Sequence, residues 1–236
     1  MSIFSEAGVQ FLLRWIHFLA GIVWIGLLYY FNFVQGPFFA EADAATKSAA
    51  TQKLVPRALW WFRWSAMLTF LSGLAILGLR QVGWSDPWGR TILTGAAFGT
   101  AMFLNVWLVI WPNQKIVIAN AVTTAGGGQA NAAAPAAARR AFLTSRTNVV
   151  FSFPMLFFMG AASHFTFSAA AGGGAFAIAL LVVIGLLELN ALTGDKGPTK
   201  QPIETVRGVI VTGFVTAAVM YGLAYGLLRA GAGATP

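Results

Sequence analysis

The sequence contains no cysteine, few charged residues and only two histidines, and each shortage removes a class of protein. Without cysteine the chain has no disulfide, no iron–sulfur cluster, no thiolate nucleophile and no covalently attached c-type haem. Charged residues make up 9% of the chain and hydrophobic residues 58%. A soluble globular domain carries about 25% charged residues, so much of this surface must face lipid rather than water.

Motifs of soluble enzymes and of nucleic-acid-binding proteins are also missing. The sequence has no phosphate-binding glycine loop, nucleophile elbow, catalytic carboxylate pair or HExxH zinc motif. The formal net charge is +8, but there is no basic helix, zinc pattern or aromatic RNA-binding motif. The basic residues lie between apolar segments, which indicates membrane topology and anionic lipid rather than nucleic acid. The N-terminus does not resemble a cleaved signal peptide.

About six apolar segments are long enough to cross a bilayer, which takes about 20 helical residues. They cover residues 9–33, 58–79, 91–111, 148–167, 174–192 and 206–228. These segments lack the polar faces that helices of a soluble protein would need. We therefore expect an all-α integral membrane bundle of about six transmembrane helices, formed as one domain over residues 1–236.

Basic residues alternate between the connections and predict the orientation. Three connections are rich in them: Lys47, Lys53 and Arg57; Lys115, Arg139, Arg140 and Arg146; and Lys196, Lys200 and Arg207. The positive-inside rule places these connections in the cytoplasm and both termini in the periplasm of a bacterial inner membrane. A flexible cytoplasmic loop is predicted at about residues 113–146, because glycine-rich and alanine-rich runs there are low in complexity. Residues 41–55 predict a short helix on the membrane surface.

His17 and His164 are the best candidates for a functional site, since ionisable residues inside a membrane are costly. Counting from the helix ends expected on the outer side puts His17 about 12 Å deep and His164 about 6 Å deep. Gly21 and Gly160 each lie one turn deeper than a histidine, on the same helix face. A flat macrocycle held between two helices needs small residues of this kind beside its ligands.

Imidazole is a common axial ligand of haem iron, so His17 and His164 predict a haem b site near the periplasmic face. Two axial histidines would make an electron-transfer haem without an open position for oxygen. Arg14, one turn outward of His17, can pair with a haem propionate or extend to lipid headgroups. Two alternatives stay open. One histidine can ligate the iron while the other serves a propionate or the substrate, or both can be structural, each bonded to a backbone carbonyl, a neighbouring helix or interfacial water.

A second polar cluster is expected near the cytoplasmic ends of the helices. Glu188 lies inside the apolar segment 174–192 and needs a partner, which Arg63 or Arg146 can supply. Such an ion pair can fix the register of the helices, or it can belong to a proton path or an anion site. Asn105 is expected to form hydrogen bonds between helices.

Several motifs resemble the membrane part of the bacterial membrane-bound urate oxidase (urate hydroxylase) family. They are IHFLAGIVWIG at 16–26, YYFNFV at 29–34, WPNQK at 111–115, SRTN at 145–148, SHF at 163–165 and LELNAL at 187–192. Members that oxidise urate continue into a C-terminal cytochrome c domain that carries a CxxCH haem site and accepts the electrons. This chain ends at Pro236 without any cysteine. The resemblance therefore implies either a separate cytochrome as electron acceptor or the loss of urate oxidation.

The sequence thus predicts a membrane redox protein that holds haem b between His17 and His164 and exchanges electrons with a periplasmic cytochrome c or a quinone. Urate is the substrate that the resemblance implies. The alternative is a non-catalytic membrane subunit of a larger respiratory or photosynthetic electron-transfer complex. A transporter is a third possibility, with weaker support because the two halves of the chain do not resemble each other.

Overall fold

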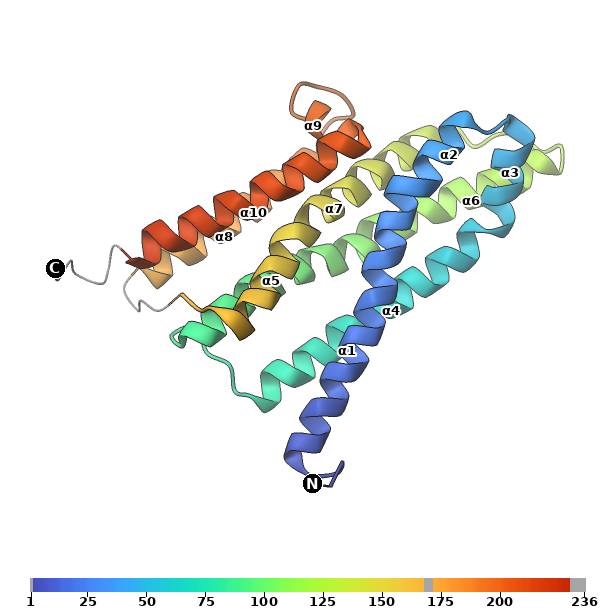
Figure 1. The fold of residues 1–236 in the computed structure, drawn as a ribbon. Helices are drawn as coiled ribbons and strands as arrows, with labels where there is room; N and C mark the ends of the chain where they lie inside the picture. Colours follow the sequence, from blue (N-terminus) through green and yellow to red (C-terminus); the bar gives the residue numbers. More distant parts are fainter. Residues whose placement is uncertain (1, 168–171, 230–236) are drawn as a thin grey trace.

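The computed structural model describes residues 2–167 and 172–229, and over these residues the chain is all-helical without a β-strand. Figure 1 shows long helices running back and forth between two ends of a bundle. The elements are α1 (Glu6–Tyr29), η1 (Tyr30–Gln35), α2 (Gly36–Glu41), α3 (Ala44–Lys53), α4 (Val55–Leu79), α5 (Pro87–Leu104), η2 (Asn105–Ile110), α6 (Trp111–Ala125), α7 (Ala134–His164), α8 (Gly173–Leu192), α9 (Gln201–Glu204) and α10 (Val206–Arg229).

Local signals in the sequence explain where several helices begin. The carboxylate of Asp43 accepts a hydrogen bond from the backbone N–H of Thr46 at the start of α3. Asp86 does the same for Gly89 at the start of α5, followed by a proline in its first turn. Such caps satisfy backbone donors that a helix leaves open. The short helix expected within residues 41–55 is confirmed as α3.

Two π-helical segments interrupt the long helices and continue without a break into the next element. η1 joins α1 to α2, and η2 joins α5 to α6, so that residues 6–41 and 87–125 each form one continuous rod. π-Helical turns are rare and frequently occur at functional sites. Asn32 lies in η1 and Asn105 begins η2, and both side chains bond to α7.

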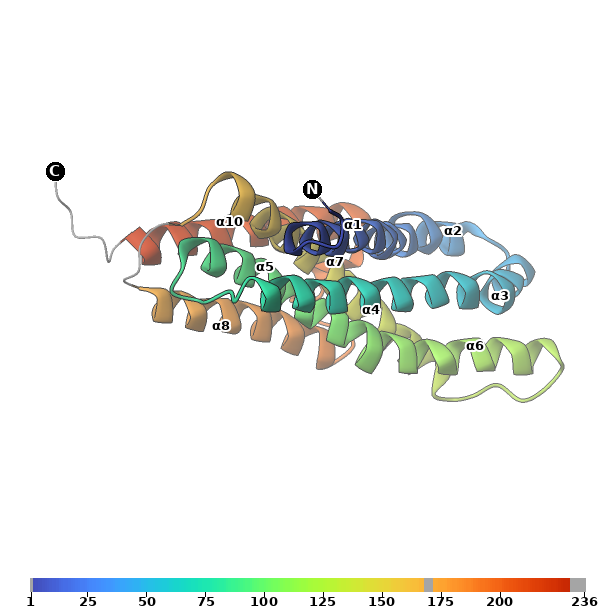
Figure 2. The same ribbon diagram turned by 90° about the horizontal axis from the view of Figure 1, so that it is seen from below.

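The helix α7 lies at the centre of the bundle. It packs against α5, α6, α8 and α10, and it contacts α1 and η1. Seen from below, α1, α2 and α10 lie on one side of the bundle and α6 and α8 on the other (Figure 2). The aromatic core includes Phe98 of α5 and Phe151 of α7, with ring centroids 5.4 Å apart.

Five helical rods among the described residues are long and apolar enough to cross a membrane, which confirms a membrane-type all-α bundle. The remaining expected span, residues 148–167, corresponds to the second half of α7, which is not among the five. Polar side chains such as Thr147, Asn148 and Ser152 are buried there against other helices. A helix enclosed by protein does not need the uniformly apolar surface that lipid demands.

The prediction of a flexible loop at residues 113–146 is wrong for most of that range. α6 extends to Ala125 and α7 begins at Ala134, so only a short connection separates the two helices. The alanine-rich run 132–138 belongs mostly to the first turns of α7. Alanine has the highest helix propensity of any residue, so low complexity here indicates helix rather than linker.

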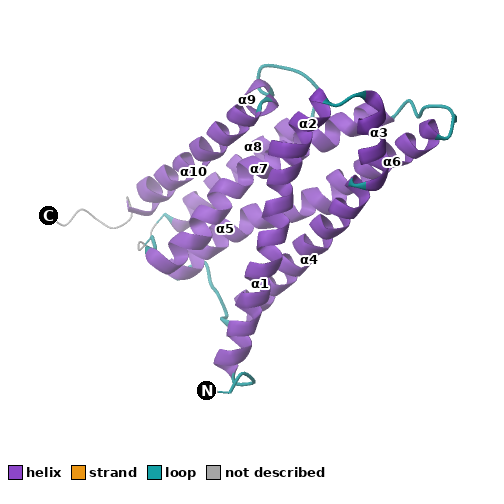
Figure 3. Ribbon diagram, turned by 45° about the vertical axis from the view of Figure 1, so that its right-hand side comes forward, coloured by secondary structure: helices purple, strands orange, loops and turns teal. Residues whose placement is uncertain are grey.

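The ends of the bundle differ in charge as the sequence predicts. The connections that follow α2, α6 and α8 lie at the end of the bundle opposite to the start of α1 (Figure 3). Most of the predicted cytoplasmic basic residues lie in the helices beside these connections, such as Lys53 in α3, Lys115 in α6 and Arg139 in α7. α1 begins and α10 ends at the same end (Figure 1). Which end faces the cytoplasm stays a prediction from the positive-inside rule.

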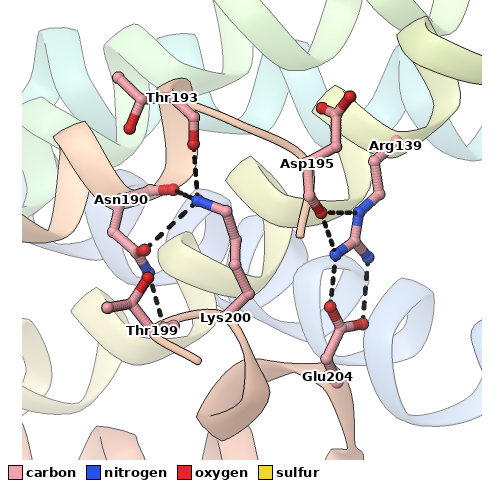
Figure 4. A network of polar contacts seen from close by, with 7 residues as sticks. All are labelled: Arg139, Asn190, Thr193, Asp195, Thr199, Lys200 and Glu204. Atoms are coloured by element: carbon pink, nitrogen blue, oxygen red, sulfur yellow. Dashed lines mark hydrogen bonds and ion pairs between the residues drawn. The ribbon is translucent and has the colours of Figure 1, made fainter. Parts of the chain in front are cut away.

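The connection from α8 to α10 is tied to the bundle by two basic side chains (Figure 4). Lys200 donates hydrogen bonds to the carbonyl oxygens of Asn190 and Thr193 at the end of α8. Arg139 of α7 donates to the carbonyl oxygen of Asp195 and forms a two-pronged ion pair with Glu204. The Arg139 hydrogen bonds hold the pKa of Glu204 below its ordinary value of 4.5.

Acidification is expected to loosen this connection. The folded-state pKa of Glu204 is lowered, so its stabilising contribution is present above pH 4.5 and is lost as the pH falls through the folded-state pKa. The Glu204 side chain is 38% exposed, so solvent screening limits the loss to about 1 kcal/mol or less. Hydrogen exchange of the backbone amides in residues 193–205 measures it. Arg139→Ala should raise exchange already at neutral pH and remove most of the pH dependence; unchanged exchange would contradict the anchoring role.

Candidate functional site

His17 lies on the face of α1 that packs against α4. Its Nδ1 is 3.2 Å from Oγ of Ser72, and a Cβ atom at Gly73 would lie 3.1 Å from its Cε1. Oγ of Ser72 lies closer to the carbonyl oxygen of Leu68, at 2.7 Å, than to His17. Because that carbonyl takes the hydroxyl proton, Ser72 accepts the hydrogen bond from His17. His17 is thereby assigned as the tautomer with its proton on Nδ1 and a free lone pair on Nε2.

His164 is the last residue of α7, and its side chain is exposed. The expectation that it lies about four residues inside the helix is therefore wrong: Phe165 is already extended, because α7 ends earlier than the apolar run. Its Nδ1 lies 2.9 Å from the carbonyl oxygen of Gly160. A carbonyl can only accept a hydrogen bond, so Nδ1 carries the proton and Nε2 is again left with its lone pair.

A contact between α1 and α7 relates the positions of the two histidines along their helices. The hydroxyl groups of Tyr29 and Ser152 are 2.8 Å apart. His17 is 12 residues before Tyr29, and His164 is 12 residues after Ser152. The two helices are antiparallel, so each histidine lies about 18 Å along its helix from the same contact. Both histidines thus lie on the same side of this contact, toward the end of the bundle where α1 begins.

The faces of α1 and α7 that meet at Tyr29 and Ser152 separate toward the histidines. Phe18 and Ile22 precede Tyr29 by 11 and 7 residues, so they share its face of α1, yet they are 68% and 70% exposed. On α7, Leu156 and Gly160 follow Ser152 and are also exposed. Figure 1 shows the axes of α1 and α7 diverging toward the start of α1. Both helix faces are therefore exposed near the histidines.

The two histidines do not bond to each other, and their rings have different surroundings. His17 lies between α1 and α4, whereas His164 lies on the exposed surface of α7. Gly160 has nothing within 4 Å of a Cβ placed on it, and Gly21 has only the methyl group of Thr69 at 3.9 Å. Both predicted glycines thus leave space beside a histidine. Arg14 bonds to Gln10 of its own helix, 3.4 Å away.

The side chains present fit a haem in donor chemistry. Ligating histidines donate their second ring N–H to a carbonyl or a similar acceptor, which fixes the tautomer and the ring orientation. Ser72 and the carbonyl of Gly160 are acceptors of that kind. Trp24, seven residues after His17 on the same face, is 2% exposed, and its Nε1 has no partner among the described residues. A ligand that carries acceptor oxygens would satisfy this buried donor.

More than half of the chain matches a known protein family. A model described as urate oxidase N-terminal matches residues 85–220, which is more than half of the 236 residues. The chain belongs to the urate oxidase N-terminal family. No curated protein and no solved structure matches it. The matched region of this family contains His164, Asn105, Asn148 and Glu188, while His17 precedes it.

In this member of the urate oxidase N-terminal family, the second polar cluster is arranged differently from the prediction. Glu188 does not pair with Arg63 or Arg146: its Oε1 accepts a hydrogen bond of 2.6 Å from Asn105. Arg63 instead lies over the ring of Trp111, 3.4 Å from its centroid. Arg146 lies over the ring of Phe142, and the carboxylate whose charge reaches it is Glu204. The role predicted for Asn105 between helices is confirmed.

Sequence reasoning missed the contribution of α4. Ser72 and Gly73 hold the ring of His17, and Thr69 lies one turn before Gly73. A signal was present in the sequence, because Ser65, Thr69, Ser72 and Gly73 form a small and polar stripe along an otherwise apolar helix. Small residues on one face let two helices approach closely. That stripe marks the side of α4 that receives α1.

Removing the hydroxyl of Ser72 is expected to weaken haem binding without unfolding the bundle. Ser72→Ala takes away the acceptor that orients His17 Nδ1–H, and loss of such a partner typically costs about 10–100-fold in ligand affinity. Titration of haem into the apoprotein, followed by absorbance, measures the affinity. Ser65→Ala, a similarly buried serine two turns away on α4, is the matched control and should leave the affinity unchanged. Equal affinity of Ser72→Ala and the wild type would contradict this positioning role.

Proposed function

We propose that this protein is a membrane redox protein that binds haem b through His17 and His164 and exchanges electrons with a cytochrome c or a quinone. One observation supports the proposal: each of the two imidazoles in the chain has its Nδ1 engaged in a hydrogen bond, which leaves Nε2 available to bind iron. Membership of the urate oxidase N-terminal family supports an oxidoreductase function.

The residues around the site have distinct tasks under this proposal. Ser72 and the carbonyl of Gly160 hold the tautomers that leave Nε2 available. Gly73 gives the ring of His17 the space that a side chain would occupy. The exposed side chains of Phe18 and Ile22 on α1 provide an apolar surface for a macrocycle. Haem, when bound, supplies one-electron transfer, and two histidine ligands leave no open position for oxygen.

Family membership also supports urate as the electron donor, and this is the finer part of the proposal. The predicted topology places the histidine end of the bundle on the periplasmic side of a bacterial inner membrane. An electron acceptor on that side would be a periplasmic cytochrome c or a quinone in the bilayer. Either electron acceptor can approach the exposed end of α7 at His164.

The visible absorption spectrum of the purified protein tests the proposal. We expect a Soret band, extraction of non-covalent haem b, and a shift to the reduced spectrum when urate is added without oxygen. A Soret band without the response to urate would retain the haem site and reject urate as donor. A colourless protein that remains folded with haem supplied in excess would contradict the proposal. If that protein co-purified in fixed ratio with a larger electron-transfer complex, it would be a non-catalytic subunit instead.

A further inference from the structure

Three polar side chains from three helices meet in the bundle, far along α7 from His164. Nδ2 of Asn105, the first residue of η2, lies 2.9 Å from Oδ1 of Asn148 on α7 and 2.6 Å from Oε1 of Glu188 on α8. Asn148 is fully buried and Asn105 nearly so. Neither the haem proposal nor the family match assigns a role to this cluster.

The hydrogen bonds in the cluster fix the direction of both amides. Nδ2 of Asn148 donates to the carbonyl oxygen of Met102, 3.1 Å away, so Oδ1 of Asn148 faces Asn105 as an acceptor. Nδ2 of Asn105 then donates to Asn148 and to Oε1 of Glu188. The other carboxyl oxygen, Oε2, is buried and has no partner among the residues that the structure describes. The carboxyl group of Glu188 therefore receives a single neutral donor.

Positive charges on the surrounding elements are directed elsewhere. Within residues 2–167 and 172–229, no basic side chain forms an ion pair with Glu188. On α7, Arg140 donates to the carbonyl oxygen of Ala191, and Arg146 lies over Phe142. Lys200 binds the carbonyl oxygens of Asn190 and Thr193. The remaining basic groups nearby are turned to aromatic rings or are exposed: Arg63 and Lys115 lie over Trp111, and Arg207 of α10 is exposed.

An ionised carboxylate is expensive in this setting. In a membrane-spanning helix, a carboxylate that has neither a cation nor a second donor carries a large desolvation cost. A neutral carboxylic acid avoids that cost: Oε1 keeps the hydrogen bond from Asn105, and the proton occupies Oε2. A proton on Oε2 removes the negative charge, which is the larger part of the desolvation cost.

We propose that Glu188 is a proton-binding site, held by Asn105 and Asn148, that carries a proton at neutral pH. Glu188 lies four residues before the end of α8 at Leu192, or about 6 Å along the helix axis. Exchange of this proton takes place with water at the end of the bundle that carries the α8–α10 connection. The histidine site lies toward the opposite end, about 24 Å along α7 from Asn148 to His164. The two sites are therefore separate.

Infrared spectroscopy of the purified protein at neutral pH tests the proposal. We expect a carbonyl stretching band of a protonated carboxylic acid that shifts on transfer to heavy water and is absent in Glu188→Gln. The matched control is Glu204→Gln, the same chemical change at a carboxylate that Arg139 pairs, and it should keep the band. A wild-type spectrum without such a band, or a band that survives Glu188→Gln, would overturn the proposal.

Labelling with a hydrophobic carbodiimide gives a second test that needs no variant. A protonated carboxylic acid adds across one C=N bond of the reagent, with its proton transferred to nitrogen, and the adduct is located by mass spectrometry. We expect labelling of Glu188 at neutral pH and none of Glu204. Wild-type protein unlabelled at Glu188 would contradict a stored proton. Neither measurement requires haem, so failure here is distinguishable from failure of the redox proposal.

Discussion

Replacing either His17 or His164 by alanine is expected to abolish the absorption spectrum of a two-histidine haem. Each variant loses one Nε2 ligand, and no cysteine elsewhere in the chain can replace it. Single removal should give either haem-free protein or a five-coordinate haem with a changed Soret band. Absorbance normalised to protein concentration measures both results.

The control for this prediction is Ser163→Ala, a change at the exposed neighbour of His164. It should retain the wild-type spectrum. The double variant His17→Ala and His164→Ala should lose haem completely, because no further histidine exists. Unchanged spectra in both single variants would show that neither imidazole binds the iron.

Enlarging Gly95 is expected to destabilise the bundle strongly. A Cβ atom at this position of α5 would lie 3.0 Å from the carbonyl oxygen of Met155 on α7 and 3.1 Å from the side chain of Met159. Gly95→Leu must therefore separate two central helices, and overpacking of this kind costs about 1–3 kcal/mol or more. Thermal unfolding in detergent, monitored by circular dichroism, measures the loss.

Gly222→Leu on α10 is the matched control for that prediction. No atom lies within 4 Å of a Cβ placed on Gly222, so the leucine meets open space. Both substitutions improve helix propensity by about 0.5–1 kcal/mol, which cancels when the two variants are compared. We expect Gly95→Leu to unfold at a clearly lower temperature than Gly222→Leu. Equal unfolding temperatures would contradict the close approach of α5 and α7.

The helices, and the connections that alternate with them, could be predicted from the sequence because a lipid environment requires long apolar segments. Lipid imposes a length and a composition on each span, so the segments from 9–33 to 206–228 correspond to observed helices. The extension of α6 and α7 into residues 113–146 was missed because alanine favours helix without being strongly apolar. Because α7 is enclosed by other helices, it carries more polar side chains than a helix that faces lipid.

The site could be predicted only in part. The position of a residue along its helix can be counted from the sequence, but the contacts of its side chain cannot. Counting residues predicts that His17 and His164 both lie toward the periplasmic ends of their helices, and in the structure they lie on the same side of the contact between Tyr29 and Ser152. The rotation of each helix decides partners, however, and the sequence does not specify it. Glu188 therefore meets Asn105 rather than a nearby arginine, and His17 meets Ser72, which belongs to a helix that sequence reasoning had not connected with the site.

Electron paramagnetic resonance of the oxidised wild-type protein, purified with haem, tests the central claim most directly. Two imidazole ligands predict a six-coordinate low-spin ferric signal that disappears in both His17→Ala and His164→Ala. A high-spin signal in the wild type, or a low-spin signal that survives either substitution, would contradict a haem held between α1 and α7.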